Sequence, residues 1–151
     1  MLTIKTYLAP SQIHGIGLFS AEYIPAGKVV WKFNDFIDKI LPEDEFVRTC
    51  RQVNPSTLQH LLSSSYKRNG KYFYITDNAR FINHSEVLHN ITFIDDFTEL
   101  TLRPIYPDQE LLENYFLAYD TDDFFCQEIL DPEPSHYLTQ LEIGVSCRAS
   151  Y

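Results

Sequence analysis

The stretch 77-DNARFINHSEVLHN-90 sets polar side chains into an apolar run. Arg80, Asn83, His84 and Asn90 all carry groups that form strong hydrogen bonds. A buried amide or imidazole costs free energy unless a partner satisfies it. These four residues must therefore serve the fold, a metal or a ligand.

The composition is that of an ordinary folded domain. The 151 residues are 44% hydrophobic and 22% charged, enough for one domain with a core of its own. The net charge of −9 argues against direct nucleic-acid binding, because a phosphate-binding groove needs clustered Lys and Arg. An acidic surface instead favours a cationic partner.

Cysteine usage and hydropathy bear on the cellular setting. Cys50, Cys126 and Cys147 are too scattered for a disulfide framework or paired zinc ligands, which favours a reduced environment. The first residues lack the apolar region of a signal peptide, and no apolar stretch approaches the roughly 18 residues of a membrane span. We expect an intracellular, cytoplasmic protein (nuclear in a eukaryote) without membrane contacts.

Short strands and turn signals outnumber helices along the chain. Strands are expected at residues 3–9, 17–24, 27–33, 71–76, 90–95, 99–105 and 110–115. Helices are expected after Pro42, after Pro55 and around residues 120–130, the last opened by Thr121 as its cap. The pattern predicts one α+β domain, mostly β, over residues 1–151. It has a helical insert at about 42–65 and a closing segment at about 121–151.

The segment 14-HGIGLFS-20 carries two glycines, Gly15 and Gly17. A dinucleotide fingerprint would need a third glycine and a helix opening from it, whereas residues 18–20 have the pattern of a strand. Two interpretations remain. The glycines form a bulge or tight turn between strands, or they let the backbone approach a ligand closely.

Three stretches taken together, 14-HGIGLFSAEYIPAG-27, 78-NARFINHS-85 and 108-DQELLENY-115, resemble the signature set of the SET-domain protein methyltransferases. The resemblance covers about residues 5–120. It implies a fold of several small β-sheets, in which the N-H-S segment and the strand that ends at Tyr115 are threaded together like a pseudoknot. It also implies S-adenosylmethionine on one face and a narrow channel that admits a lysine from the other.

The resemblance assigns roles to particular residues. The residues that it implies for cofactor binding come from all three motifs: His14, Gly15, Ile16, Gly17, Asn83, His84 and Tyr115. Tyr115, at the inner end of the channel, and Tyr66, which helps to line the site, are the implied catalytic residues. For the ring of His84 we expect a place in the core with a backbone partner rather than a ligand.

Methyl transfer to lysine is an in-line displacement at a sulfonium methyl, so positioning should dominate catalysis. Only the neutral amine attacks, and desolvation in a dry channel lowers the ordinary lysine pKa of ~10.4. Tyr115 suits this place because its ring walls the channel and its hydroxyl orients the amine without carrying charge.

No metal site is expected, because zinc sites commonly use paired cysteines that this chain lacks. Many SET enzymes carry a C-terminal three-cysteine zinc cluster, but only Cys126 and Cys147 lie in that part of this chain. Another group must then close the channel. Phe124, Phe125 and Tyr137 are the candidates, with ordinary core packing as the alternative.

Glu113 departs from the family, which often has Phe or Tyr two residues before the tyrosine. Its carboxylate could sit beside the lysine and oppose attack, or it could point to solvent. The number of methyl groups added is therefore not predicted.

The expected activity is S-adenosylmethionine-dependent methyl transfer to the ε-amine of a lysine in a basic protein or histone-like tail. The implied partner is thus a lysine-bearing basic protein or peptide. One alternative is a catalytically impaired SET-fold module that binds a peptide or the cofactor without turnover, and another is a structural partner protein. Small SET proteins sometimes pair to complete a substrate groove, so a homodimer is possible.

Overall fold

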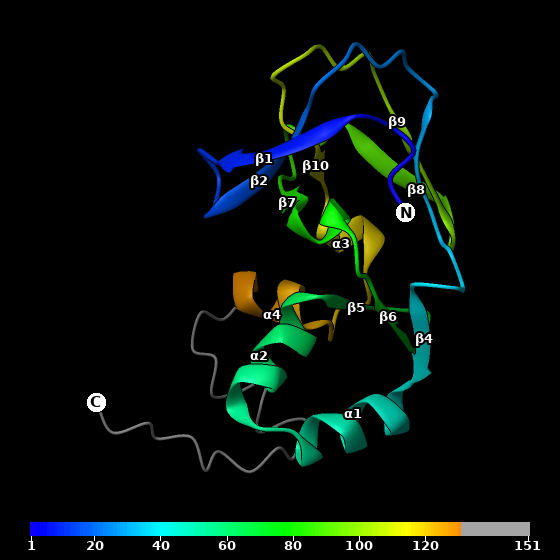
Figure 1. Cartoon of the computed structure of the whole chain (residues 1–151), viewed down its shortest axis with the longest axis vertical. Coiled ribbons are helices and arrows are strands. Elements are labelled where there is room, and N and C mark those ends of the chain that lie inside the picture. The colour runs from blue at the N-terminus through cyan, green and yellow to red at the C-terminus, as the bar shows by residue number, and fades with distance from the viewer. Residues whose placement is uncertain (131–151) are drawn as a thin grey trace. The chain divides into compact units, whose positions relative to one another are not determined.

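The computed structural model describes residues 1–130 and divides the chain into two compact units (Figure 1). The first unit consists of Met1–Lys39 and Ile75–Ala118, and the second contains, among the described residues, Ile40–Tyr74 and 119–130. The predicted class is confirmed: short strands in four small sheets dominate, with a few helices.

The first unit holds three of the sheets. Its strands are β1 (Thr6–Pro10), β2 (Ile16–Ser20), β3 (Val29–Lys32), β7 (Asn83–His84), β8 (Ile91–Asp95), β9 (Thr98–Thr101) and β10 (Leu112–Glu113). β1 and β2 form an antiparallel hairpin, the order β3-β9-β8 makes an antiparallel sheet, and β7 pairs with β10 in parallel. A 3-10 helix, η1 (Asn78–Phe81), precedes β7, and helix α3 (Tyr115–Ala118) follows β10.

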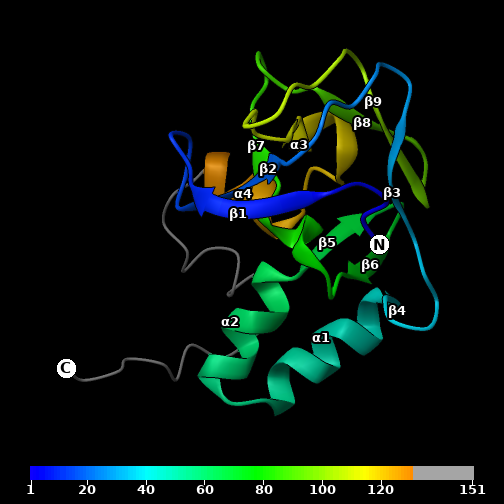
Figure 2. The same cartoon turned by 45° about the horizontal axis from the view of Figure 1, so that its top comes forward.

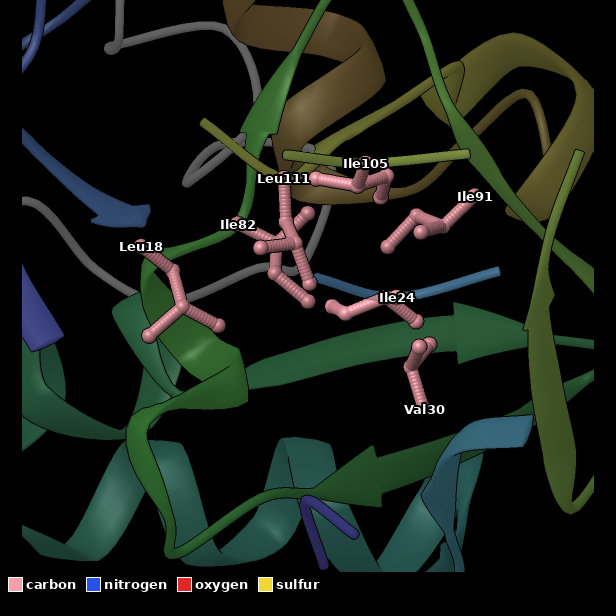
Figure 3. Packing of buried hydrophobic residues seen from close by; sticks show 7 residues of the cluster. All are labelled: Leu18, Ile24, Val30, Ile82, Ile91, Ile105 and Leu111. Carbon is pink, nitrogen blue, oxygen red and sulfur yellow. The ribbon is translucent and has the colours of Figure 1, made fainter. Parts of the chain in front are cut away.

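The core of the first unit is aliphatic. Its buried residues come from β2, β3, β8 and the segments between strands, and they point toward one another in Figure 3: Leu18, Ile24, Val30, Ile82, Ile91, Ile105 and Leu111. Ile82 directly precedes Asn83, and Leu111 directly precedes β10. Burial of these two neighbours, each favourable by about 1.5–3 kcal/mol, fixes the backbone that carries the polar motif.

The second unit combines two helices with a three-stranded sheet. Its elements are β4 (Lys39–Pro42), α1 (Glu43–Gln52), α2 (Pro55–Ser63), β5 (Ser65–Arg68), β6 (Lys71–Tyr74) and α4 (Phe124–Leu130), and Figure 2 shows β5 and β6 side by side. The helices predicted after Pro42 and Pro55 are confirmed.

A separate core holds the second unit together. Phe46 of α1 stacks on Tyr72 of β6 with ring centroids 3.8 Å apart, and Cys50 and Leu62 are buried with them. Phe124 packs against this cluster, so its core interpretation is the one that the structure supports. Phe125 contacts the ring of Phe124, and Tyr137 lies outside the described residues.

The predicted cap of α4 is wrong. Asp123, rather than Thr121, accepts a hydrogen bond from the Phe125 N–H at 2.8 Å, and its second carboxylate oxygen accepts from the Lys67 N–H of β5. A short acidic side chain two residues before a helical N–H can satisfy that donor. Because Asp123 is fully buried, its carboxylate also joins the helix start to the sheet.

Asp123→Asn is expected to destabilise the protein by about 2 kcal/mol. Asparagine offers one acceptor oxygen where the backbone N–H groups of Lys67, Phe125 and Cys126 need acceptors, so its amide nitrogen would face an N–H donor. Urea unfolding at fixed pH measures the change. Asp122→Asn is the matched control, because the Asp122 side chain is 59% exposed and pairs with Lys67, and it should cost under about 1 kcal/mol. Equal losses in the two variants would contradict this account.

Candidate functional site

The polar motif and the end of the 108–115 motif form one threaded structure. Leu112 lies opposite Asn83 and Glu113 lies opposite His84 in the parallel β7–β10 pair. On the other side, Asn90 donates its backbone N–H to the Leu112 carbonyl at 2.9 Å and accepts the Leu112 N–H on its side chain at 2.9 Å. Residues 110–113 therefore run between β7 and Asn90, as predicted for the pseudoknot.

The hydrogen bonds of Asn90 all belong to this threaded structure. Its side-chain nitrogen donates to the Glu110 carbonyl at 2.8 Å, and its own carbonyl accepts from the Leu102 N–H at 2.8 Å. A buried amide that satisfies backbone groups on a neighbouring segment acts as a structural tie. Of the four polar residues first singled out, Asn90 thus serves the fold.

Asn83 joins the motif to the glycine segment. Its side-chain nitrogen lies 3.0 Å from the His14 carbonyl oxygen, 3.3 Å from the Ile16 carbonyl oxygen and 2.9 Å from Glu110 Oε1. Three acceptors around one nitrogen fix which end of the amide faces the glycine segment. Within residues 1–130, no donor contacts Asn83 Oδ1, so this oxygen remains available as an acceptor.

The two glycines serve different purposes. Gly15 has φ +50° in the loop between β1 and β2, a conformation that glycine adopts without strain. Gly17 lies within β2, and a Cβ built on it would stand 2.1 Å from Glu110 Oε1. Of the two interpretations, the turn between strands is confirmed, and the close approach at Gly17 is to a carboxylate of the same chain.

Ser11 organises the loop that carries His14. Its hydroxyl donates to Glu110 Oε2 at 3.0 Å and accepts the N–H groups of Ile13 at 2.8 Å and His14 at 3.3 Å. Its own N–H donates to the Gly15 carbonyl at 2.9 Å. The loop is therefore held by its own polar groups and by Glu110.

The ring of His84 packs inside with a backbone partner, as predicted. Its Nδ1 accepts the Tyr115 N–H at 3.0 Å, and its ring lies 5.1 Å from that of Tyr115 and 5.0 Å from that of Phe116. Burial lowers the pKa of His84 below its ordinary value. The ring is therefore neutral near pH 7, with its proton on Nε2, which suits an acceptor at Nδ1.

Tyr115 is buried at the start of α3, and its hydroxyl donates to the Ile82 carbonyl oxygen. This bond links the tyrosine to the residue immediately before Asn83. The two contacts of Tyr115, through its N–H and through its hydroxyl, both reach the 82–84 segment. The structure thus brings Tyr115, Asn83, His84 and the glycine segment together in the first unit.

Tyr66 belongs to the second unit. It lies on β5, and its ring stacks on Phe73 at 5.2 Å and on Tyr119 at 4.7 Å. These contacts make it part of an aromatic stack that spans two strands and the chain after α3. Its role beside Tyr115 stays a prediction.

Glu113 neither points to solvent nor stands alone. It is 2% exposed and hydrogen-bonds Glu99 of β9, which is 4% exposed. Burial raises the pKa of Glu99 well above its ordinary value, and the charge of Glu113 and their hydrogen bond raise it further. Ionisation of Glu99 is therefore disfavoured beside Glu113 in the folded protein.

Sequence reasoning missed Glu110 and Ser11 as parts of this site. Glu110 stood inside the 108–115 motif, but nothing in the linear sequence joined it to Gly17. The available signal was the glycine itself, because a glycine within a strand often marks the close approach of another group.

Two further findings concern metals and membranes. Among residues 1–130, no three or more His, Cys, Asp or Glu side chains gather in a way that could hold a metal ion. Cys50 and Cys126 are buried free thiols. In the same part of the chain, every helix is too short or too polar to cross a membrane.

The comparisons with known proteins agree with this arrangement. A sequence model described as the SET domain matches residues 15–116. The polycomb repressive complex 2 of Chaetomium thermophilum is similar in structure, with 24% identity and a TM-score of 0.55 over 74% of this chain. A structure of ctPRC2 bound to S-adenosylmethionine has 22% identity and a TM-score of 0.58 over 91% of this chain.

These similar chains are much longer. This chain covers 15% and 17% of their respective lengths. No curated protein matches the sequence significantly.

Proposed function

Because the chain belongs to the SET-domain family, we propose that it is an S-adenosylmethionine-dependent protein-lysine methyltransferase. The observation that carries this proposal is the orientation of Asn83. Its nitrogen is held by His14, Ile16 and Glu110, which leaves its oxygen to accept from a ligand. An amide oxygen held in this way, next in the chain to the carbonyl that Tyr115 contacts, suits the ammonium end of a methionine-like ligand.

The residues of the first unit fit the cofactor. Asn83 Oδ1 would accept from the ammonium group, and the backbone of the 14–16 segment and of His84 would contact the rest of the molecule. When bound, S-adenosylmethionine supplies a methyl group activated by a sulfonium charge. The carbonyls of His14 and Ile16 are already engaged by Asn83, so this segment is ordered before any ligand arrives.

Tyr115 would position the substrate amine. Its hydroxyl donates its proton to the Ile82 carbonyl, so its oxygen lone pairs face other groups as acceptors. An amine N–H that donates to this oxygen has its nitrogen lone pair directed elsewhere, as an in-line attack requires. The neutral His84 ring behind Tyr115 adds no positive charge, and the tyrosine is held from both its N–H and its hydroxyl.

The proposed substrate is a lysine in a basic protein or a histone-like tail. The net charge of −9 would speed the approach of such a partner. We also propose a single functional domain, with the 42–65 helices as an insert, and an intracellular location. The impaired-module alternative drew its main support from Glu113, and Glu99 provides that carboxyl with a partner within the fold.

Asn83→Ala is expected to weaken S-adenosylmethionine binding by about 10- to 100-fold, since one charge-assisted hydrogen bond and the order of the glycine segment are lost. Calorimetric titration of S-adenosylmethionine and of its demethylated product measures this. The matched control is Asn78→Ala, because Asn78 is an exposed amide on η1. A wild-type protein that binds neither compound at millimolar concentration would overturn the proposed function.

A further inference from the structure

We infer that Glu110 is a positioning residue, whose carboxylate holds the Asn83 amide and the glycine segment in the arrangement that presents Asn83 Oδ1 to the cofactor. This inference rests on the proposed function. Glu110 itself touches neither the amine nor the methyl group in this account, and it acts through Asn83 and Ser11.

Both oxygens of the Glu110 carboxylate are engaged. Oε1 accepts from Asn83 at 2.9 Å, and Oε2 accepts from the Ser11 hydroxyl at 3.0 Å. Because the Ser11 proton goes to Glu110, the Ser11 oxygen is free to accept from the N–H groups of Ile13 and His14. One half-buried carboxylate thereby sets the orientation of two side chains, one from each of the motifs that meet here.

The charge of Glu110 determines which end of the Asn83 amide faces outward. An amide has a donor end and an acceptor end of nearly the same shape. Rotated by half a turn, Asn83 would place its oxygen against the carbonyls of His14 and Ile16 and against a carboxylate. A hydrogen bond to a charged acceptor is about twice as strong as a neutral one, so Glu110 contributes most to excluding that rotated state.

Gly17 provides the space that this carboxylate needs. A Cβ at this position would lie 2.1 Å from Oε1 and 2.7 Å from Cδ of Glu110, well inside van der Waals contact. The φ angle of Gly17 is not positive, so the backbone itself would accept alanine. The strongest constraint on residue 17 thus comes from Glu110, and Ser11 Cβ, 3.1 Å from the same position, is the next contact.

Glutamine and methionine at position 110 separate hydrogen bonding from packing. Glu110→Gln keeps an acceptor for Asn83 but loses the charge, so we expect a moderate loss of S-adenosylmethionine affinity, about threefold. Glu110→Met fills the same volume without an acceptor and should weaken binding by about 10- to 100-fold. Glu22→Gln and Glu22→Met are the matched controls, because Glu22 is a half-buried carboxylate of the same unit that accepts the Lys5 N–H at 2.9 Å. Neither control should change affinity.

A second experiment tests the link to Gly17. Gly17→Ala should weaken S-adenosylmethionine binding by about tenfold or more, and so should Glu110→Ala. Because the added methyl group meets the carboxylate far more closely than Ser11 Cβ, which is 3.1 Å away, the loss in the double variant should be much smaller than the sum of the two single losses. If Gly17 instead packs against the cofactor, the two losses will add.

A third measurement needs no ligand. In the wild-type protein without cofactor, the side-chain NH2 of Asn83 should exchange slowly in NMR spectra, and it should stay protected in Glu110→Gln but lose protection in Glu110→Met. This NMR measurement tests the role of Glu110 even if Glu110→Ala does not fold, because it uses only the wild type and the glutamine and methionine variants.

The outcomes are distinguishable. Wild-type binding with equal affinities for the glutamine and methionine variants, or additive losses at residues 17 and 110, would overturn this inference alone. A wild-type protein that does not bind S-adenosylmethionine would overturn the proposed function and this inference with it.

Discussion

Tyr115→Phe is expected to lower methyl transfer to a lysine peptide by at least about 100-fold, the usual size of the loss when a group that positions or polarises a reacting atom is removed. The phenylalanine ring keeps the packing against His84, but the hydroxyl that donates a hydrogen bond to the Ile82 carbonyl is absent. S-adenosylmethionine affinity should change by less than about threefold, because Asn83 and the glycine segment are untouched.

Single-turnover kinetics and calorimetry on the same preparations separate these two effects. Tyr7→Phe is the matched control, since it also removes a tyrosine hydroxyl that donates to an acceptor, here Asp108 at 2.7 Å, within the first unit. It should leave turnover unchanged. If Tyr115→Phe loses cofactor binding and turnover in equal proportion, the tyrosine is a cofactor-holding residue, and its proposed role toward the amine is wrong.

Glu99→Gln is expected to remove a large part of the pH dependence of stability. Folded Glu99 keeps a proton that the unfolded chain releases above pH ~4.3, so the free energy of unfolding falls as the pH rises. The slope is about 1.4 kcal/mol per pH unit until the pH passes the raised pKa of Glu99. Glutamine retains the hydrogen bond to Glu113 and cannot ionise. As the pH rises above ~4.3, the stability of the wild type should therefore fall more steeply than that of the variant.

Other charges near the pair act in known directions. The charge of Asp77 raises the pKa of Glu99, and the Met1 ammonium lowers it. In the second unit, burial raises the pKa of Asp123 to about 7, so the slope in Glu99→Gln should shrink rather than vanish. Urea unfolding from pH 5 to pH 8 measures both slopes, with Glu22→Gln as control. Identical slopes for wild type and Glu99→Gln would show that Glu99 is ionised in the folded protein.

Most regular elements were predictable from the sequence because their signals are local. The Asn69-Gly70 turn is one example: both residues have positive φ, and Asp120 accepts their N–H groups at 2.9 Å and 2.8 Å. The strands that escaped prediction have other causes. β7 has only two residues, and β5 carries Lys67, a buried lysine that looks exposed in sequence until Glu43 and Asp122 are placed beside it.

The site was predictable in part for the same reason. Asn83, His84 and Tyr115 lie in the short stretches that resemble the motifs of SET-domain proteins. Glu113 could not be interpreted, because its partner Glu99 is on a different strand. Glu110 and Gly17 are separated by most of the first unit, so no local pattern relates a carboxylate to the glycine that makes room for it.

The passage of residues 110–113 between β7 and Asn90 has a consequence for how the protein folds. The first unit is assembled from two stretches that the second unit interrupts, and its central ties join β1, β2 and β7 to residues 108–113. Such distant pairings must overcome loop-closure entropy before they gain contacts. We therefore expect the hydrogen-bonded site around Asn83 to form last, on the millisecond-to-second scale typical of β-rich domains, and only once the ribosome has released the chain beyond Tyr115.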